Sequence, residues 1–328
     1  MRAVVLTEYG SIANLTLTEF ADPVPGPMDV IVDVRAGAVN YVDLVMIGGT
    51  YQFRPEVPFV PGKAPAGIVR MVGSDVIDFM PGDRVVGMAE QGAFAELTPV
   101  HQDNCYHLPE TLSFIHAASM ALIFDTAWFS LIQRGRFEKG EAVLVLGASG
   151  GVGLASIQLV KALGGRAIAA ISNPEKAYLV HEAGADHIVD LNAENLRDSL
   201  REQVFSVTDG QGADIVIDPL GGDIFDAALR AVAWRGRVVI IGFAAGRIPT
   251  VKTNYLLVKN IDVGGLQISD YRRRRPDLTA ECFDQIFELY RSGKVSPLPT
   301  ATLPFEEFAE GLKMVANRTV NGRIVLTQ

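Results

Sequence analysis

The stretch that decides the fold runs Ala142-Val-Leu-Val-Leu-Gly-Ala-Ser-Gly-Gly-Val-Gly153 and continues Leu-Ala-Ser-Ile-Gln-Leu-Val-Lys-Ala-Leu163. Residues 142–146 are apolar without polar alternation, which is typical of a parallel strand buried on both faces. A glycine-rich turn and an amphipathic helical pattern follow. Glycines remove side chains where backbone N–H groups would approach a diphosphate, and a helix directs its partially positive end toward the same place. The order of strand, glycine turn and helix therefore predicts a dinucleotide-binding α/β fold.

The glycine turn departs slightly from the usual Gly-x-Gly-x-x-Gly fingerprint. It reads Ala148-x-Gly150-x-x-Gly153, so a methyl group replaces one hydrogen at the first position. We expect Ala148, Gly150, Gly151 and Val152 to lie against the diphosphate. The alternative is a structural glycine turn that binds nothing.

The choice of nucleotide depends on the end of the next expected strand, residues 167–171. NAD-specific sites place an acidic residue there to accept hydrogen bonds from the ribose. This chain has Ser172, Asn173 and Lys176 instead, and these side chains could donate hydrogen bonds to a 2′-phosphate. The sequence thus favours NADPH (NADP⁺ when oxidised) as the cofactor. In the alternative interpretation Asn173 caps a helix that begins at Pro174 and Lys176 is an incidental surface residue; the two interpretations are compatible.

Composition excludes several classes of protein. The chain has 328 residues and a formal net charge of −9, which argues against a nucleic-acid partner. No apolar run approaches the roughly 18 residues that span a bilayer, and the first residues lack the apolar core of a signal peptide. We therefore expect a cytoplasmic protein without a membrane partner. Two cysteines, Cys105 and Cys282, exclude a disulfide framework.

The hydrophobic pattern divides the chain into three parts. Residues 1 to about 115 contain short β-rich runs, such as 30–34, 67–72 and 84–88, which predict a partly open β-barrel with little helix. From about 119 to 266 strands alternate with helices, as in a doubly wound parallel sheet. Strands are expected there at 142–146, 167–171, 187–189, 214–217, 237–241 and 261–263. The tail supplies a helix near 278–291 and a strand at 323–326, and should return to the first part because it is too short to fold alone.

Seven segments carry a family resemblance when they are taken in order. They are 38–43 (Ala-Val-Asn-Tyr-Val-Asp), 81–85 (Pro-Gly-Asp-Arg-Val), 92–96 (Gly-Ala-Phe-Ala-Glu), the glycine turn, 172–176, 218–222 and 321–326. The chain resembles the medium-chain dehydrogenase/reductase superfamily and, within it, the zinc-free, zeta-crystallin-like NADPH:quinone oxidoreductases. The resemblance implies a GroES-like barrel domain over 1–118, a Rossmann domain over 119–266 and a return segment of the barrel domain over 267–328.

The resemblance also bears on metal binding. Zinc alcohol dehydrogenases of this superfamily have metal ligands at the positions that hold Asn40 and Lys63 here. Asn is a poor zinc ligand and a protonated Lys is none, so we expect no catalytic zinc. The spacing of Cys105 and the five histidines shows no other zinc pattern. At Ala64 the chain departs from its own group, which frequently has Glu there.

Loss of the metal constrains the chemistry. Without a Lewis acid, the accessible reaction is hydride delivery to an electron-poor acceptor such as a quinone or an α,β-unsaturated carbonyl, because hydrogen-bond donors suffice to stabilise the delocalised charge. The expected partner is thus a small-molecule electron acceptor. The resemblance places these residues near the nicotinamide: Asn40, Thr126, Phe243, Ala244 and the backbone after Leu266. Arg323 either reaches the cofactor from the tail or is a charge at a strand edge.

The proton donor is less sharply defined. Tyr51 corresponds to a tyrosine that lines the acceptor pocket of quinone reductases, so Asn40, Tyr51 and Thr126 are the candidate catalytic residues. Tyr41 and Tyr271 are further candidates, and a proton from solvent is as plausible. Asp43 is expected to brace its loop.

Two alternative functions remain open, and the resemblance also predicts an oligomeric state. Arg272–Arg275 could bind the phosphates of an acyl-CoA, which would make the protein an enoyl-thioester reductase, or could form a solvated turn, the interpretation favoured here. An NADPH-binding protein with little turnover is a second alternative. The resemblance finally implies a homodimer formed by pairing edge strands of two nucleotide domains, with 238–241 and 260–264 near the seam.

Overall fold

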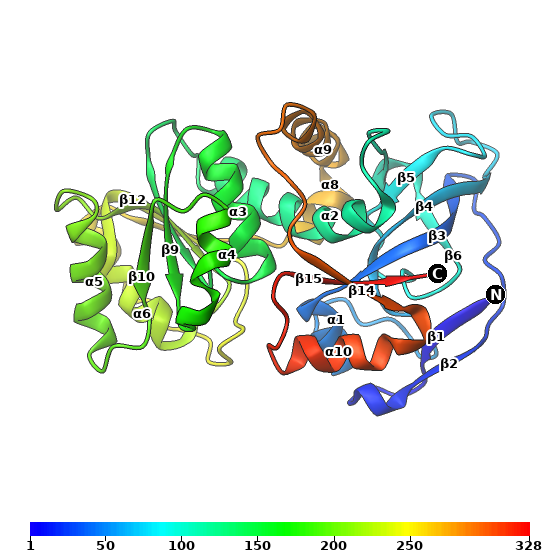
Figure 1. Cartoon of the computed structure of the whole chain (residues 1–328), viewed down its shortest axis with the longest axis horizontal. Coiled ribbons are helices and arrows are strands. Elements are labelled where there is room, and N and C mark those ends of the chain that lie inside the picture. Colours follow the sequence, from blue (N-terminus) through cyan, green and yellow to red (C-terminus); the bar gives the residue numbers. More distant parts are fainter. The chain divides into compact units, whose positions relative to one another are not determined.

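A computed structural model describes all 328 residues and divides into two compact units (Figure 1). Unit 1 comprises Met1–Leu122, Ser269–Phe287 and Pro297–Gln328, and unit 2 comprises Ile123–Ile268 and Glu288–Ser296. The division after Leu122 falls inside one helix, α2 (Phe114–Phe129), rather than at the expected 118/119 boundary. The segment 288–296 was expected with the tail but groups with unit 2. One reason is that the Ser296 N–H donates to the side chain of Gln158, at 2.8 Å.

Unit 2 is built on six parallel strands in the spatial order β10-β9-β8-β11-β12-β13. Their bounds are β8 (Ala142–Leu146), β9 (Arg166–Ile171), β10 (His187–Asp190), β11 (Ala213–Asp218), β12 (Val232–Ile240) and β13 (Asp262–Gly265). Counted within the unit, this order is 3-2-1-4-5-6, the doubly wound arrangement that the sequence predicts. The six expected strands are confirmed. Strand β12 begins earlier than expected because its register with β11 shifts at an irregularity, where Arg235 has a φ of +64°.

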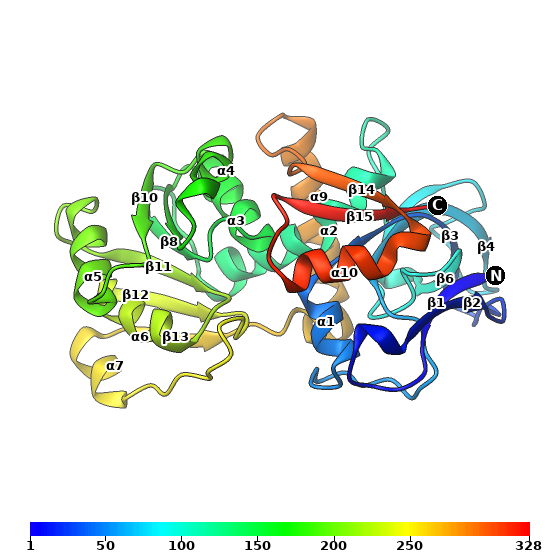
Figure 2. The same ribbon diagram turned by 60° about the horizontal axis from the view of Figure 1, so that its bottom comes forward.

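Helices cover both faces of this sheet, as Figure 2 shows. They are α3 (Gly151–Ala162), α4 (Ala177–Glu182), α5 (Leu196–Ser206), α6 (Gly222–Ala231) and α7 (Thr253–Lys259). All five residues of β8 are buried, as its apolar run without alternation predicts. The sheet reverses its order of addition between β8 and β11. Loops at the carboxyl ends of these two strands are therefore where a ligand of such a fold binds.

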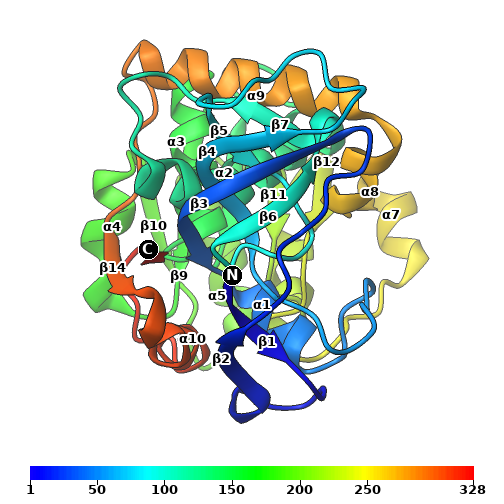
Figure 3. The same ribbon diagram turned by 90° about the vertical axis from the view of Figure 1, so that its right-hand side faces the viewer.

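Unit 1 contains a seven-stranded sheet and a two-stranded ribbon (Figure 3). The ribbon pairs β1 (Arg2–Leu6) with β2 (Leu15–Glu19). The larger sheet contains β3 (Asp29–Val39), β4 (Lys63–Val72), β5 (Arg84–Gly87), β6 (Leu97–His101), β7 (Cys105–His107), β14 (Thr300–Pro304) and β15 (Arg323–Thr327). Strand β15 pairs antiparallel with β3, so the tail adds to the sheet formed by the first hundred residues.

The remaining helices are α1 (Tyr41–Ile47), α2, α8 (Ile268–Arg274), α9 (Pro276–Arg291) and α10 (Phe308–Ala316). Helix α9 covers the region expected to be helical and is amphipathic, with Cys282 and Phe283 buried. Phe283 stacks on Tyr106 of β7 with ring centroids 4.1 Å apart. Most of the arginine run lies in α8, so the expected turn is wrong for Arg272–Arg274. Solvation was predicted correctly for Arg273–Arg275, which are exposed, whereas Arg272 is buried.

Helix α2 corrects a second expectation. With the π-helical turn Ser130–Arg134 it forms one helix of 21 residues that is long and apolar enough to cross a membrane by length and composition. Residues 114–134 contain no uninterrupted apolar run, because isolated polar residues such as Ser119 and Asp125 divide them. In its most apolar part 72% of the residues are buried inside the protein, as in the core helices of globular proteins.

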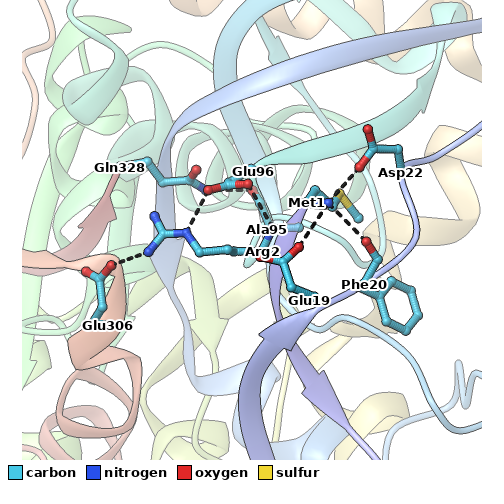
Figure 4. A network of polar contacts seen from close by, with 9 residues as sticks. All are labelled: Met1, Arg2, Glu19, Phe20, Asp22, Ala95, Glu96, Glu306 and Gln328. Carbon is cyan, nitrogen blue, oxygen red and sulfur yellow. Dashed lines mark hydrogen bonds and ion pairs between the residues drawn. The ribbon is translucent and has the colours of Figure 1, made fainter.

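The two chain ends lie close together on unit 1 (Figures 1 and 3). The Met1 amine donates to Asp22 at 2.7 Å, and Arg2 pairs with Glu96 at 2.8 Å and with Glu306 at 2.7 Å (Figure 4). The side chain of Gln328 donates to the carbonyl of Ala95, at 2.7 Å. These contacts join β1, the segment before β6, the turn after β14 and the last residue of the chain.

Candidate functional site

The turn between β8 and α3 has the geometry that the glycine fingerprint predicts. A Cβ on Gly153 would lie 2.6 Å from both Cα and O of Ala148, which are backbone atoms, so only glycine lets the helix approach the turn. Ala148 itself is fully buried and has an ordinary φ, which explains why a methyl group is tolerated there. The left-handed position belongs to Gly147, with a φ of +59°. Sequence reasoning missed Gly147, although its spacing of three from Gly150 was visible.

This turn fits a diphosphate. Gly150 is the N-cap of α3, a helix of 12 residues, and no side chain accepts a hydrogen bond from the helix start at that cap. Backbone N–H groups of the first turn are thus directed outward, where an anion would also meet the positive end of the helix dipole. Because Gly153 has no Cβ, α3 packs closely against Ala148, and the N–H groups of its first turn lie near the end of β8.

The end of β9 holds the residues expected to choose the nucleotide. Asn173 caps the short turn Pro174–Lys176, because its side-chain oxygen accepts the Glu175 N–H at 2.9 Å. The expected cap is confirmed, and it leaves the amide NH₂ of Asn173 as the group that could donate to a phosphate. Ser172 is exposed, and partial burial lowers the pKa of Lys176. No carboxylate side chain occupies positions 172–174.

The carboxyl ends of β11, β12 and β13 carry the remaining predicted residues of unit 2 except Thr126. Ala244 donates its N–H to the carbonyl of Pro219 at 3.0 Å, which ties the loop after β12 to the loop after β11. Phe243 is 41% exposed beside this junction. The Leu266 N–H donates to the carbonyl of Ile240 at 2.9 Å. The predicted cofactor residues after these strands therefore lie at the sheet edge where a dinucleotide binds in this fold.

Asp218, at the end of β11, is a residue to which sequence reasoning gave no role. Its Oδ1 accepts the N–H groups of Leu220 and Gly221 at 2.8 and 2.9 Å. Its Oδ2 is buried and makes no hydrogen bond within the protein. Burial raises the pKa of this carboxyl despite the two backbone donors. The residue organises the turn that faces the fingerprint strand β8 across the switch point.

Thr126 lies on the part of α2 that belongs to unit 2. Its hydroxyl donates to Asp125 at 3.2 Å, and its carbonyl accepts the Ser130 hydroxyl at 2.7 Å. The role predicted for it beside a nicotinamide stays a prediction.

In unit 1, Asn40 and Arg323 are in direct contact. Arg323 donates to Oδ1 of Asn40 at 2.5 Å and to the carbonyl of Ser119 at 3.2 Å. Its guanidinium is buried, and burial lowers its pKa to about 10 although Asp43 opposes this shift. The interpretation of Arg323 as a charge at a strand edge is therefore wrong, because β15 is covered on the side where this residue lies.

Asp43 braces the start of α1, as expected. Its carboxylate accepts the backbone N–H of Asn40 at 2.7 Å. Complete burial raises the pKa of Asp43 to about 6, while the Asn40 N–H and the charges of Lys63 and Arg323 act in the opposite direction.

A second buried group of charges surrounds Glu90, which sequence reasoning missed. Lys63 forms an ion pair and hydrogen bond with one carboxylate oxygen, and Arg272 pairs with the other at 3.3 Å. The ammonium of Lys63 also lies 5.0 Å from the ring centroid of Tyr51. The hydroxyl of Tyr51 is 3.4 Å from Oγ of Ser269, which hydrogen-bonds Glu90. A lysine within the apolar run around Pro61–Ala66 was the available signal, since a buried cation requires a partner.

The arginine run is thus split by its surroundings. Arg272 is 4% exposed and points to Glu90, while Arg273 pairs with Asp270 at 2.8 Å and Arg275 with Asp277 at 2.6 Å. Neither interpretation from the sequence, a site for acyl-CoA phosphates or a solvated turn, accounts for the buried member.

The two positions at which zinc enzymes of this superfamily have ligands hold no metal-binding geometry here. Asn40 accepts from Arg323, and Lys63 pairs with Glu90. No three side chains of His, Cys, Asp or Glu lie together in a way that could hold a metal ion anywhere in the 328 residues.

A surface pocket of about 420 Å³ opens on unit 1 near the chain ends, and none of the predicted site residues lines it. Several of its charged groups are already paired, among them Met1 with Asp22 and Arg2 with Glu96 (Figure 4). We therefore treat it as part of the polar network that fastens β1 and not as the functional site.

Comparisons with known proteins agree with this architecture. The family model described as alcohol dehydrogenase GroES-like domain matches residues 26–110, and the one described as zinc-binding dehydrogenase matches 151–284, a stretch that excludes positions 40 and 63. A quinone oxidoreductase-like protein 2 homolog of Nematostella vectensis is 35% identical over 99% of this chain and 88% of its own length.

Solved structures extend the match to three dimensions. The quinone oxidoreductase of Pseudomonas syringae has a TM-score of 0.92 at 28% identity, covering 100% of this chain and 99% of its own. The Escherichia coli quinone oxidoreductase complexed with NADPH has a TM-score of 0.90 at 27% identity, covering 100% of both chains. Together with the replacement of both zinc-ligand positions, these matches show that the chain belongs to the zinc-free quinone oxidoreductase group of the medium-chain dehydrogenase/reductase superfamily.

Proposed function

We propose that this protein is an NADPH-dependent oxidoreductase that delivers hydride to a quinone or an α,β-unsaturated carbonyl. The observation that carries the proposal is the turn at Gly153, which has no room for a Cβ and directs the first N–H groups of α3 outward. The complex of the similar E. coli enzyme with NADPH supports the choice of cofactor.

Residues of unit 2 would hold the cofactor. The backbone of Gly150, Gly151 and Val152 would donate to the pyrophosphate at the positive end of α3. Ser172, the amide of Asn173 and the ammonium of Lys176 would donate to the 2′-phosphate, which an acidic residue at the same strand end would repel. The nicotinamide ring would lie beside Phe243, Ala244 and the backbone at Leu266, which are at the ends of the neighbouring strands β12 and β13.

When bound, NADPH supplies the hydride, and the protein supplies orientation, exclusion of water and a proton. Hydride addition to a conjugated carbonyl leaves negative charge on oxygen, which donors in a buried site stabilise strongly. Unit 1 offers such a site: Lys63, Arg272 and Arg323 carry three buried positive charges, against the carboxylates of Glu90 and Asp43. Tyr51, half-buried beside Lys63, is the side chain that would donate the proton.

The test is a substrate panel with the purified protein. NADPH oxidation is followed with quinones, short enones and enoyl thioesters, and NADH is compared with NADPH. We expect turnover with a quinone or an enone and a preference for NADPH. Binding of NADPH without oxidation by any acceptor would favour a binding protein. Turnover confined to thioesters and inhibited by coenzyme A would favour the acyl-CoA alternative, which the burial of Arg272 against Glu90 leaves without its original support.

We also propose that the protein is a homodimer formed through unit 2. Strand β13 is the edge of the parallel sheet, and an edge strand exposes backbone groups that readily pair with another chain. Nearby on α7, Leu257 and Val258 are 78% and 75% exposed, which is unusual for apolar side chains adjacent to each other. Light scattering should give a mass near 71 kDa, twice the 35.4 kDa of one chain (2 × 35.4 = 70.8). A mass of one chain at micromolar concentration would contradict the dimer.

A further inference from the structure

Glu90, in the loop after β5, is contacted by residues of two elements of unit 1. Lys63 begins β4, Arg272 and Ser269 lie on α8, and all three contact the Glu90 carboxylate. Ala64, next to Lys63, is fully buried and has a φ of +57°, a conformation that costs an alanine about 1 kcal/mol or more. Strain at this position shows that the surrounding fold fixes the backbone that carries Lys63.

The hydrogen bonds around Glu90 have a defined direction. An ionised carboxylate only accepts, so the Ser269 hydroxyl must donate to it. The lone pairs of Ser269 Oγ are then available to Tyr51, whose hydroxyl lies 3.4 Å away and would donate to Ser269. The chain of donors therefore runs from Tyr51 to Ser269 to Glu90. Protonation of Glu90 would allow the direction of these hydrogen bonds to reverse. Glu90 would then donate to Ser269, Ser269 would donate to Tyr51, and Tyr51 would donate to an acceptor molecule.

Solvent reaches the carboxylate at the end of this chain, and Ser269 and Tyr51 are half-buried as well. The side chains of Lys63 and Arg272 are 2% and 3% exposed, whereas the Glu90 side chain is 25% exposed. The charged groups that face the carboxylate are Lys63 from β4 and Arg272 from α8, and the charge of Lys63 also acts on Asp43 of α1. Burial alone would favour protonated Glu90, but the two cations outweigh it and lower its pKa.

We propose that Glu90, Ser269 and Tyr51 form a proton path from solvent to the acceptor, and that Lys63 and Arg272 position the Glu90 end of that path. This inference rests on the proposed function, since it supplies the proton that an enone requires besides hydride. Tyr51 is the catalytic residue of the path, because it would touch the acceptor, and the other four are positioning or relay residues.

The proton transfers balance as follows. Hydride adds to the β-carbon of an enone, and the displaced electron pair forms an enolate. The enolate α-carbon takes the proton of the Tyr51 hydroxyl. Glu90, ionised at rest, first takes a proton from solvent. The phenolate then takes the Ser269 proton while Ser269 takes the proton that Glu90 has received, and Glu90 returns to its ionised form. One solvent proton is consumed for each enone reduced.

A comparison of enones with quinones tests the proton path separately from hydride transfer. A reduced quinone can leave as an anion and take its proton from bulk water, whereas an enolate must be protonated on carbon before release. S269A should therefore lower kcat for an enone by about tenfold or more, as expected for loss of general acid support. It should leave kcat for a quinone within about twofold and should increase the solvent deuterium isotope effect on enone reduction. S269T, which keeps the hydroxyl, should restore the enone rate.

The matched control is D270N, at the neighbouring and exposed residue whose carboxylate pairs with Arg273. It should change neither rate. Equal losses for enone and quinone in S269A would overturn the path, because they indicate a general disturbance of the site. Unchanged enone turnover in S269A would overturn it as well.

A measurement without cofactor tests the hydrogen-bond chain itself. The pKa of Glu90, followed by ¹³C NMR of labelled glutamate and assigned with E90Q, should rise in S269A because one donor to the carboxylate is lost. It should rise further in K63M and stay unchanged in D270N. No rise in S269A would overturn the chain whether or not the protein turns over. If the wild type oxidises NADPH with neither acceptor, the proposed function fails and the path fails with it.

Discussion

Replacing Gly153 by alanine would place a methyl group in backbone atoms of the turn before α3. The added Cβ would lie 2.6 Å from Ala148 Cα and 2.6 Å from its carbonyl oxygen, distances that carbon atoms do not reach without movement. Neither neighbour is the end of a flexible side chain, so relief requires α3 and the turn to separate. Overpacking of this kind costs about 1–3 kcal/mol.

The cost should appear both in stability and in cofactor binding. For a unit of this size about 1 kcal/mol corresponds to a change in Tm of ~2–4 °C, so G153A should lower Tm by roughly 2–12 °C. Movement of the turn displaces the N–H groups that would meet the pyrophosphate. If a loss of 1–3 kcal/mol also falls on the complex, Kd for NADPH rises by about 5- to 150-fold. Calorimetric unfolding and NADPH fluorescence titration measure the two quantities.

Ala162→Gly provides the matched control at the other end of α3. Glycine costs up to about 1 kcal/mol in a helix, so stability should fall toward the lower end of the same range while Kd for NADPH stays within about twofold. An unchanged Tm and an unchanged Kd in G153A would contradict this prediction, because they would mean that the turn accommodates the methyl group. A fall in Tm without any change in Kd would mean that Gly153 is required for packing but not for NADPH binding, and would contradict the second half of the prediction.

Three further predictions concern single charged groups. Lys176→Ala should weaken NADPH binding by about tenfold or more and leave NADH binding unchanged, since a charge-assisted hydrogen bond to the 2′-phosphate contributes ~1.5–3 kcal/mol; equal effects on both cofactors in titrations would contradict the assignment. Glu90→Gln leaves the buried Lys63 without its carboxylate and should lower the free energy of unfolding by about 3 kcal/mol, much of which K63M/E90Q should recover in calorimetry; a double variant no more stable than E90Q would be inconsistent with the ion pair. The pKa of Asp43 is about 6 in the folded protein against an ordinary value of 3.8, so its contribution to stability is fully present below pH 3.8 and is lost as pH rises through 6. The stability of the wild type relative to D43N should therefore fall between pH 4 and 6. A rise over that range would show that the pKa is lowered in the folded protein.

The sequence predicted the nucleotide-binding unit well because its signals are local. An uninterrupted apolar strand, a glycine turn and an amphipathic helix each follow from neighbouring residues, and the six strands of the sheet were placed by the same pattern. The glycine of the tight turn, Gly147, was not singled out. Gly147, and not position 148, has the positive φ, and composition alone does not distinguish adjacent positions in a turn.

The buried charges of unit 1 could be predicted only in part because their partners are distant in the chain. Lys63 and Glu90 are 27 residues apart, Glu90 and Arg272 are 182 apart, and Arg323 and Asn40 are 283 apart. An arginine run in an acidic protein looks solvated in sequence, yet the helix α8 buries one of its members against Glu90. Such pairs depend on how β4, α8 and β15 come together in unit 1, which no local pattern encodes.

The most direct test of the central claim is the fate of the hydride. Purified protein is incubated with an enone and NADPH that carries deuterium at both hydrogen positions of nicotinamide C4, and the product is examined by mass spectrometry and NMR. The proposed function predicts one deuterium at the former β-carbon for each NADPH oxidised, with the α-carbon proton derived from water. Absence of deuterium from the product, or oxidation of NADPH without any reduced acceptor, would contradict it.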